Sequence, residues 1–337
     1  MVAAPTMSPV QEEVSATSET TTPSASTEGA VLVVVLRLGS HPLSTEILES
    51  LSILRRNYPV HSVVVVENSD GQADSKVEQP GVDVTIRLTS NRGYAEAMNT
   101  AVGSVDTELC SALLFMTDDA AVTAGSLDLL LRPLSGDHIA IAAPAILTDG
   151  QLRLGGTWNA TFGWSRHIVA QTEGRNSVKT PVWADGACLA VKRSVFNELG
   201  GFDERTFLYV EDVQLGVRAT QLGHRVGIVP EVVITQRSGM RNRSGAHGYL
   251  LMRNEMMSIR ATGHSVLPAA TVGIVRSGLE IVRAASERNH RIHHLRQALG
   301  MAWGVYHGLA RRTGPPPRRL AEWANIPAIE HHSVLRA

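Results

Sequence analysis

Short apolar runs that alternate with helical patterns constrain the fold of this chain more than any other feature. Val31–Leu36 and Val63–Val66 are rich in β-branched residues and continuously apolar, as in strands buried on both faces of a sheet. Leu43–Asn57, between them, carries apolar residues at helical spacing. Val84–Leu88 and Leu113–Met116 predict two further strands, again with a helix between them. Strands that alternate with helices predict an α/β fold with a mostly parallel sheet flanked by helices.

After residue 140 the alternation of strand-like and helical segments becomes less regular. Residues 149–182 are glycine-rich and predicted to be irregular, and from residue 247 onward the sequence predicts helices. The first residues are rich in Ser, Thr, Glu and Pro without periodicity, which is typical of disorder. We therefore expect three parts, namely a disordered tail at 1–29, an α/β domain at 30–262 and a helical, arginine-rich extension at 263–337.

Charge and cysteine content restrict the partners and the cellular compartment that the sequence predicts. The net charge of −1 gives no reason to expect a nucleic-acid partner, and two cysteines, Cys110 and Cys188, favour a reducing compartment over a disulfide scaffold. No basic segment followed by an apolar stretch opens the chain, and its apolar runs are too short to span a bilayer. The sequence thus predicts a cytoplasmic protein.

The last third of the chain is strongly basic. Residues 253–319 hold 11 Arg against three Glu, a local balance of 11 − 3 = +8. Such helices can rest on the anionic inner face of a membrane, which would give peripheral membrane contact. They can equally form a homodimer interface or a plain solvated face, and the sequence leaves these interpretations open.

Two acidic pairs follow strand-like or turn-like segments. Asp118-Asp119 comes after a strand and Thr117, where carboxylates can hold Mg²⁺ or Mn²⁺, although such a pair is more often a turn or a helix cap. Glu211-Asp212 opens a predicted helix, where the helix dipole alone favours acids. A carboxylate fixed there can also act as a general base toward a sugar hydroxyl.

Three other segments have a structural and a functional interpretation each. Asn91-Arg92-Gly93-Tyr94 is either a helix-entry turn or a loop against a nucleotide, with Arg92 near its diphosphate. Trp183-Ala184-Asp185-Gly186-Ala187 is either an apolar turn or a platform for a sugar ring. Arg253-Asn254-Glu255, on a predicted helix, has the solvated face as its simplest interpretation.

Together and in this order, these segments resemble glycosyltransferase family 2, in particular its bacterial rhamnosyltransferase-like branch. The resemblance covers about residues 31–260 and implies a GT-A fold. The segments that carry it are Glu67-Asn68-Ser69, Asn91-x-Gly93-Tyr94 with Asn99, Asp118-Asp119, Gly186-Ala187, Gly200-Gly201-Phe202-Asp203-Glu204, Phe207-x-Tyr209-x-Glu211-Asp212 and Arg253-Asn254.

The resemblance implies a role for individual residues. Asp212, paired with Glu211, would be the catalytic base, and Asp119 with Gln236 would hold a divalent cation, Mg²⁺ or Mn²⁺. The residues implied in binding the donor are Glu67, Asn68, Asn91, Arg92, Gly93, Asp118, Trp183, Gly186 and Ala187.

The implied reaction is an inverting transfer of a sugar from a nucleotide diphosphate to a hydroxyl group. The resemblance suggests rhamnose from dTDP-rhamnose, with UDP- and GDP-linked donors open, and the acceptor is a carbohydrate, a lipid-linked saccharide or a small molecule, with a cell-envelope polysaccharide among them. Thr117 and Gln236 stand where the family commonly has Asp and His, so a catalytically impaired sugar-nucleotide-binding paralogue is the alternative. A nucleotidyltransferase is disfavoured, because Leu36–Pro42 is not a glycine-rich basic phosphate loop.

Overall fold

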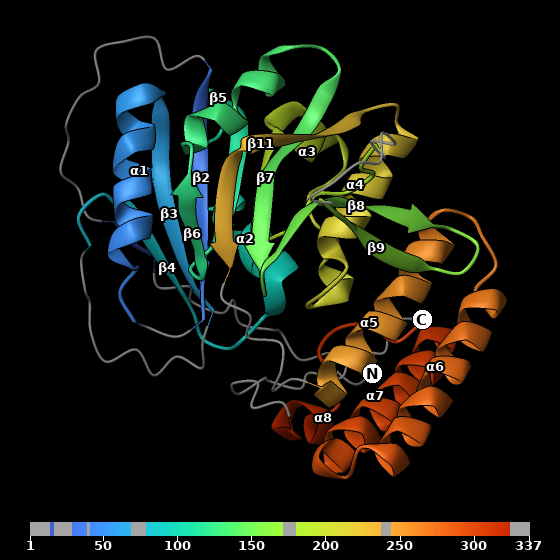
Figure 1. Cartoon of the computed structure of the whole chain (residues 1–337). Coiled ribbons are helices and arrows are strands. Elements are labelled where there is room, and N and C mark those ends of the chain that lie inside the picture. Colours follow the sequence, from blue (N-terminus) through green and yellow to red (C-terminus); the bar gives the residue numbers. More distant parts are fainter. Residues whose placement is uncertain are drawn as a thin grey trace, which may run out of the picture.

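Alternate side chains of the central strands build two apolar cores, one on each face of a single sheet. The computed structural model of the chain describes residues 14–16, 29–38, 41–68, 79–170, 180–236 and 244–323. Val31, Val33 and Val35 pack with helix α1 (Thr45–Asn57) on one face. Leu32 and Val34 pack on the other face, which is covered by the helices α2 (Gly93–Gly103), α3 (Arg193–Glu198) and α4 (Glu211–Gln221) (Figure 1). Burial on both faces explains why these strands are continuously apolar.

The first half of the sheet is parallel, as predicted. Its strands stand in the order β4-β3-β2-β5, and Val33 of β2 lies between Val63 of β3 and Leu114 of β5. The bounds of these strands are β2 Ala30–Arg37, β3 Val60–Asn68, β4 Val84–Leu88 and β5 Cys110–Thr117. The prediction of an α/β fold with helices on both faces is confirmed.

The second half of the sheet is mixed in direction. β10 lies antiparallel between β5 and β7, while β11 runs parallel to β7 and antiparallel to β6. This brings the ends of β5 and β11, which are far apart in sequence, to one edge of the sheet. The strands are β6 Ala120–Ala124, β7 Ile139–Thr148, β10 Cys188–Lys192 and β11 Arg225–Gln236.

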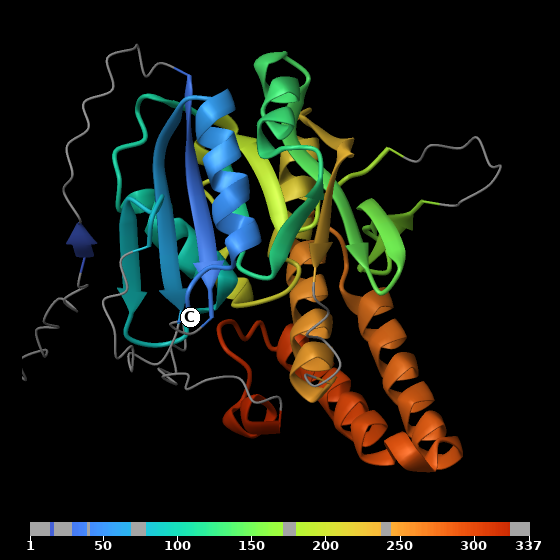
Figure 2. The same ribbon diagram turned by 60° about the vertical axis from the view of Figure 1, so that its left-hand side comes forward.

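Two segments differ from the sequence-based expectation. The predicted irregular stretch 149–182 is wrong for Gln151–Asn159 and Trp164–Val169, which form the hairpin β8–β9. This hairpin gave no signal because glycines and polar residues interrupt any alternation of apolar side chains. Within the predicted tail, Val14–Ala16 forms β1, which pairs antiparallel with β4, and the rest of 1–28 lies outside the described residues (Figure 2).

The C-terminal part is a helical assembly beside the sheet domain (Figures 1 and 2). Helices α5, α6 and α7 share an apolar core that includes Met252, Met256 and Val305. Helix α5 also contacts the sheet domain, through Tyr249 and Leu250 beside Phe207. Within the described residues no helix combines the length and apolarity needed to cross a membrane. The helices are α5 Ser244–Ala261, α6 Leu267–Ser286, α7 Arg291–Leu309 and the short α8 Arg318–Trp323.

Helix α5 therefore packs against both parts of the chain. The predicted boundary between the two parts at 262 stays a prediction. What the packing does show is a close approach of α5 and α7 that depends on glycine. A Cβ atom at Gly304 would overlap the backbone carbonyl oxygen of Tyr249.

We expect Gly304→Ala to destabilise the protein by about 1–3 kcal/mol, because the added methyl group forces α7 away from α5. Gly278→Ala is the matched control, since Gly278 lies inside α6 with open space around it. There the same substitution should stabilise by about 0.5–1 kcal/mol through helix propensity. Urea unfolding measures both variants, and equal effects would contradict the close approach.

Candidate active site

A pocket of about 490 Å³ opens at the carboxyl ends of β2 and β5 and extends to helix α5. The carboxyl ends of parallel strands are where such sheets bind ligands. Most of the residues that the sequence singled out line this pocket. They are Asn68, Asn91, Gly93, Asp118, Asp119, Trp183, Gly186, Ala187, Glu211, Asp212 and Gln236.

One end of the pocket holds the pair Asp118-Asp119, in the turn between β5 and β6. The Thr117 hydroxyl donates to Oδ1 of Asp119, and Nε2 of Gln236, the last residue of β11, lies 3.5 Å from Oδ2 of Asp119. Nε2 of His41 lies 2.8 Å from Oδ2 of Asp118. Burial raises the pKa of Asp118, and the nearby His41 acts in the opposite direction.

This end fits a divalent cation that takes most of its ligands from elsewhere. Among the described residues no three His, Cys, Asp or Glu side chains form a ready-made metal site. Mg²⁺ and Mn²⁺, however, are commonly held by one or two carboxylates together with phosphate oxygens and water. Asp119 and Asp118 supply such carboxylates, and Gln236 can present its amide oxygen by turning its side-chain amide over.

Glu67 is not among the residues that line the pocket, and its expected contact with the donor stays a prediction. It is buried within the sheet, where its carboxylate pairs with Arg37 of β2 and, at 3.1 Å, with Arg87 of β4. The three residues stand side by side in register across neighbouring strands. Opposite charges in adjacent strand positions stabilise the pairing of the strands, so Glu67 contributes to the sheet through these ion pairs.

Arg92 also lies outside the lining, with its guanidinium 3.6 Å from Glu96 on the same helix. Its backbone N–H donates to the Asn68 side chain (2.8 Å), and the Asn68 amide donates to Asn91 (3.1 Å) and to the Gly93 carbonyl (2.9 Å). These bonds fix the entry to α2, so the structural interpretation of this turn holds. The predicted contact of Arg92 with a diphosphate remains a prediction.

The loop before α4 has an unusual backbone. Phe207, Tyr209 and Val210 have φ values of 65°, 68° and 74°, a region that residues other than glycine occupy at a cost of about 1–3 kcal/mol each. This loop docks on α2, since the Tyr94 N–H donates to the Phe207 carbonyl at 2.7 Å. A Cβ atom at Gly93 would overlap that carbonyl.

Helix α5 holds the loop from the other side. The Asn254 side-chain amide donates to the carbonyls of Thr206, Leu208 and Tyr209 at 2.7–3.0 Å, and Arg253 donates to Thr206 at 2.7 Å. Arg253 and Asn254 are both 0% exposed. The interpretation of this segment as a solvated face is therefore wrong. Its polar groups are buried because they satisfy backbone carbonyls that have no partner in secondary structure.

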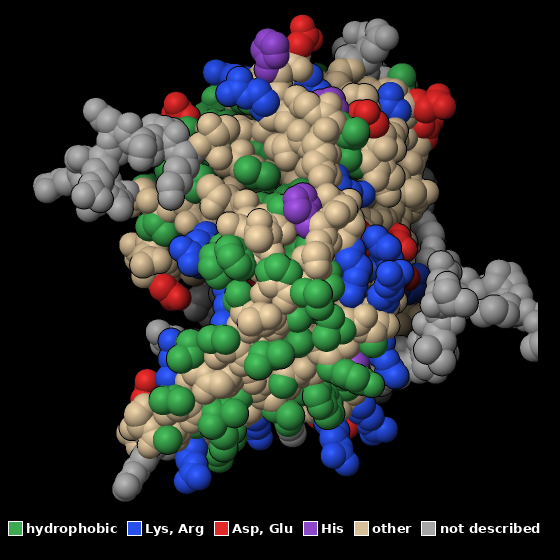
Figure 3. Space-filling view, turned by 90° about the vertical axis from the view of Figure 1, so that its right-hand side faces the viewer, with side chains coloured by type: hydrophobic (Ala, Val, Ile, Leu, Met, Phe, Trp, Pro, Cys, Tyr) green, Lys and Arg blue, Asp and Glu red, His purple; other side chains and the backbone are tan. Residues whose placement is uncertain are grey.

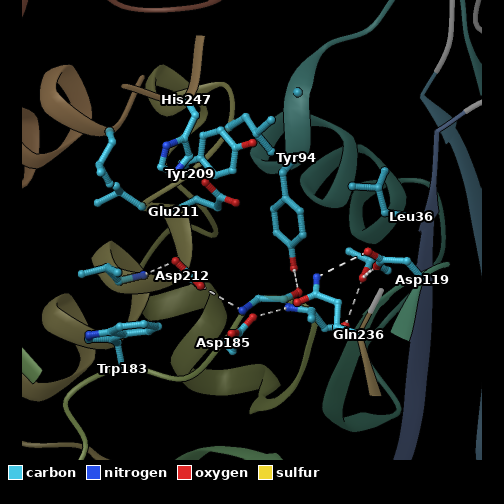
Figure 4. A pocket seen from close by; sticks show the side chains of 18 of the residues that line it. Leu36, Tyr94, Asp119, Trp183, Asp185, Tyr209, Glu211, Asp212, Gln236 and His247 are labelled. Atoms are coloured by element: carbon cyan, nitrogen blue, oxygen red, sulfur yellow. Dashed lines mark hydrogen bonds between the residues drawn. The ribbon is translucent and has the colours of Figure 1, made fainter. Parts of the chain in front are cut away.

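Asp212 stands in the pocket wall at the start of α4, which the loop leads into. Backbone N–H groups of Gly186 and Val213 donate to its two oxygens at 2.9 and 2.7 Å. Burial, reinforced by the charge of Asp185, raises the pKa of Asp212 to about 7, while the two backbone bonds act to lower it. Figure 4 shows Asp212 and Asp119 at opposite ends of the pocket, with Tyr94 between them.

Glu211 is more deeply buried than Asp212, and its pKa is raised well above the usual range by burial and then by the charge of Asp212. Tyr94 donates from its hydroxyl to the Gly186 carbonyl at 2.8 Å, which fixes the segment that holds Asp212. Two acids with raised pKa values in one cleft are a physical indication of a functional site.

Several lining residues were not proposed from the sequence. Asp185 lies inside a segment that had been singled out, and its Oδ1 accepts from the Ala187 N–H at 3.1 Å. Arg153 and His167 come from the unpredicted hairpin, and Arg153 lies 3.6 Å from Asp185. The sequence did indicate Asp185, because it is a third acidic residue and lies between Trp183 and Gly186. Nothing in the sequence indicated Arg153 or His167.

The raised pKa of Asp212 makes a prediction about stability. Between pH 4 and 7 the folded state holds the Asp212 proton more tightly than the unfolded state, so this group lowers the stability as the pH rises through that window. Asp212→Asn should therefore be more stable than the wild type at pH 8, by about 1 kcal/mol or more, with the difference shrinking at pH 5. Denaturant unfolding at the two pH values measures this.

Asp203→Asn is the control, for which we expect the opposite effect on stability at pH 8. Burial raises the pKa of Asp203, but hydrogen bonds and charge from Arg205 outweigh it and hold the pKa below its ordinary value. Removal of this carboxylate should destabilise the protein at pH 8, because the ionised form is the stabilised one. The same pH trend in both variants would contradict the assigned environment of Asp212.

The chain is similar to known glycosyltransferases. Residues 29–247 match the family model described as "Glycosyltransferase like family 2". N-acetylglucosaminyl-diphospho-decaprenol L-rhamnosyltransferase of Mycobacterium tuberculosis is 30% identical over 231 residues, which cover 60% of this chain and 74% of that protein. A low-salt glycan biosynthesis hexosyltransferase of Haloferax volcanii is 25% identical over 238 residues, which cover 68% of this chain and 76% of that protein.

Among solved structures, a mannosyltransferase from Pyrobaculum calidifontis in complex with GDP-Man and Mn²⁺ is 15% identical, with a TM-score of 0.42 over 82% of this chain and 86% of that chain. The match to the family model covers more than half of the chain. The chain therefore belongs to glycosyltransferase-like family 2, and the prediction of a nucleotide-sugar-dependent glycosyltransferase is confirmed.

Proposed function

We infer that this glycosyltransferase inverts the anomeric centre of its donor and that Asp212 is its general base. The observation that carries this proposal is the half-buried Asp212 carboxylate, with its pKa raised to about 7, in the wall of a pocket whose far end holds Asp119. A base with a pKa near the working pH is the most effective one for proton transfer.

In the proposed reaction the acceptor hydroxyl oxygen attacks the anomeric carbon in a single displacement. The new C–O bond forms as the bond to the diphosphate breaks, and the hydroxyl proton passes to Asp212. A single displacement inverts the configuration, and its transition state has oxocarbenium character, as in glycoside hydrolysis. The backbone N–H groups of Gly186 and Val213 orient the carboxylate for this transfer.

The other end of the pocket would receive the diphosphate. Asp119, Asp118 and Gln236 would hold a divalent cation there, and when bound the cation supplies positive charge to the leaving group. The remaining residues proposed for the donor are those of the lining, namely Asn68, Asn91, Gly93, Trp183, Gly186 and Ala187. Glu211, next to the base, raises the local negative charge when ionised.

Rhamnose is the proposed sugar, with dTDP-rhamnose as donor, because a relative with 30% identity is named as an L-rhamnosyltransferase. The same name, which specifies N-acetylglucosaminyl-diphospho-decaprenol, supports a lipid-linked saccharide as the acceptor, and a cell-envelope polysaccharide remains a prediction. UDP- and GDP-linked donors are the alternatives to test. The expected location in the cytoplasm, at the inner face of the membrane, and a homodimeric state remain predictions.

Donor binding is tested by thermal unfolding of the purified chain with UDP-, dTDP- and GDP-sugars, each with and without Mn²⁺. A ligand at 100 times its dissociation constant stabilises the fold by about 2.7 kcal/mol, so one nucleotide should raise the Tm and do so more strongly with Mn²⁺. The protein stabilised by that donor is then assayed for sugar transfer. Binding without transfer to any acceptor would favour the impaired, sugar-nucleotide-binding paralogue.

Asp212→Asn should lower kcat by about 10²–10⁴-fold, because general-base assistance is lost. The Tm shift with donor should persist, since Asp212 lies at the end of the pocket opposite to Asp119. The wild-type kcat/KM should rise with pH and level off above pH 7. Asp137→Asn, an exposed site, is the control that keeps full activity. An Asp212→Asn enzyme with wild-type turnover would remove Asp212 from this role.

Gln236→His should increase the affinity for Mn²⁺ about tenfold or more, because imidazole is a better ligand for this ion than an amide oxygen. The side chain at 236 already faces Asp119, so the substituted ring would point to the same place. The Mn²⁺ concentration that gives half of the donor-dependent Tm shift measures this. Asp119→Asn should abolish the Mn²⁺ effect, and a Gln236→His variant indistinguishable from the wild type would place the cation elsewhere.

A further inference from the structure

Helix α6 is apolar on two opposite faces, only one of which is covered. Its inner face packs against α5 and α7 through small residues, among them Ala269, Ala270 and Gly273. Its outer face carries large aliphatic side chains that are more than half exposed. They are Leu267 (67%), Ile274 (63%), Val275 (56%), Leu279 (52%), Ile281 (55%) and Val282 (65%). Residues seven apart share one line along a helix, so these side chains form one continuous stripe.

Helix α7 adds a second stripe to the first. Ile292 (66% exposed), Leu295 and Leu299 follow one another at helical spacing, and Tyr306 (65% exposed) continues them. Figure 3 shows hydrophobic side chains gathered over this end of the molecule, with Lys and Arg side chains along the borders of the gathering. We call this surface, formed by the outer stripes of α6 and α7, the outer helical face. Contiguous exposed apolar surface of this kind marks a site of interaction.

The hairpin β8–β9 extends the outer helical face with aromatic residues. Phe162, 41% exposed, stacks on Trp164 with ring centroids 5.2 Å apart. Arg276 of α6 stands over the Trp164 ring, 5.6 Å from its centroid, which ties the hairpin to the helix. Aromatic residues beside cationic ones are favoured at the boundary between lipid and water.

The exposed charges around the outer helical face are mostly positive. Arg283, Arg291, Arg311 and Arg312 are exposed on α6, α7 and the turn that follows. The acidic residues of α6 and of its C-terminal cap, Glu280 and Glu287, are already paired. Glu280 contacts Arg283 and, at 2.7 Å, His294, while Glu287 lies 3.2 Å from His294.

The positive charge of the outer helical face favours one of two binding partners, a second copy of the chain or an anionic membrane. A second copy of the chain, meeting this face through a two-fold axis, would bring two surfaces of the same net positive charge together, because such an interface uses the same surface twice. An anionic lipid surface supplies the missing negative charge and also accepts the aliphatic side chains. We propose that the outer helical face docks on the surface of an anionic membrane, with α6 and α7 lying in the interfacial region.

The test uses the full chain and lipid vesicles, and it needs no assay of sugar transfer, so it is independent of the proposed function. Co-sedimentation is measured with vesicles of phosphatidylcholine alone and of phosphatidylcholine mixed with phosphatidylglycerol, at low and at high salt. We expect binding to the mixed vesicles that weakens with salt, because the charge contribution is screened.

Ile274→Gln/Ile281→Gln should lower the partition onto mixed vesicles by about tenfold or more, a change that corresponds to 1.4 kcal/mol. Arg291→Gln/Arg312→Gln should remove most of the preference for the anionic lipid. The matched control is Leu109→Gln/Leu222→Gln, which replaces leucines exposed to 47% and 53% outside the outer helical face. Because all these side chains are exposed, circular dichroism and Tm should remain those of the wild type.

Three results would overturn the proposal. The first is a folded wild-type chain that stays in the supernatant with the mixed vesicles. The second is an isoleucine variant that binds as well as the wild type. The third is a wild-type dimer in sedimentation velocity that the isoleucine variant loses, with no lipid binding by either, which would assign the outer helical face to a second copy.

Discussion

The side-chain amide of Asn254 is the contact on which the arrangement of the site depends. It donates to three carbonyls of the loop that leads into α4, and Arg253 shares one of them. The Thr206 carbonyl also accepts from the Leu208 N–H at 2.9 Å, but loss of the Asn254 amide would take this hydrogen bond from the carbonyls of Leu208 and Tyr209, at a cost of about 1–3 kcal/mol for each group. The loop sets the first turn of α4, and Asp212 stands in that turn. The position of the carboxylate thus follows from a helix that begins 32 residues later in the chain (244 − 212 = 32).

The parts of the fold that the sequence predicted are those in which the pattern is local. Val31–Leu36 and Val63–Val66 are strands because they are buried on both faces, and burial of that kind leaves a continuous apolar run. Asp119 and Asp212 stand where a recognisable element ends or begins, which made them candidates, but their roles came from the family resemblance. Both line the same pocket in the fold, where the pairing of β11 with β6 also brings Gln236 beside Asp119.

The parts that could not be predicted depend on partners far away in sequence. Arg253 and Asn254 have the composition of a solvated face, and only the carbonyls 45–48 residues earlier make their burial favourable. Glu67 follows the family pattern for a donor-binding acid, yet the register of three strands places it between Arg37 and Arg87. A family resemblance identifies the position of such a residue in the sequence, but it does not predict which charged side chains surround that residue in the fold.

The site concentrates features that destabilise a fold, and the C-terminal helices offset them. Three residues with positive φ and two acids with raised pKa values lie within six consecutive positions, 207–212. Helix α5 satisfies the carbonyls of this segment on one side and packs against α6 and α7 on the other. The helical part is therefore a structural requirement of the pocket. Helix α5 also lines the pocket, with His247 and Leu251. A surface that binds the outer helical face would therefore fix the distance between itself and the pocket. A lipid-linked acceptor would then enter from the side on which its membrane lies.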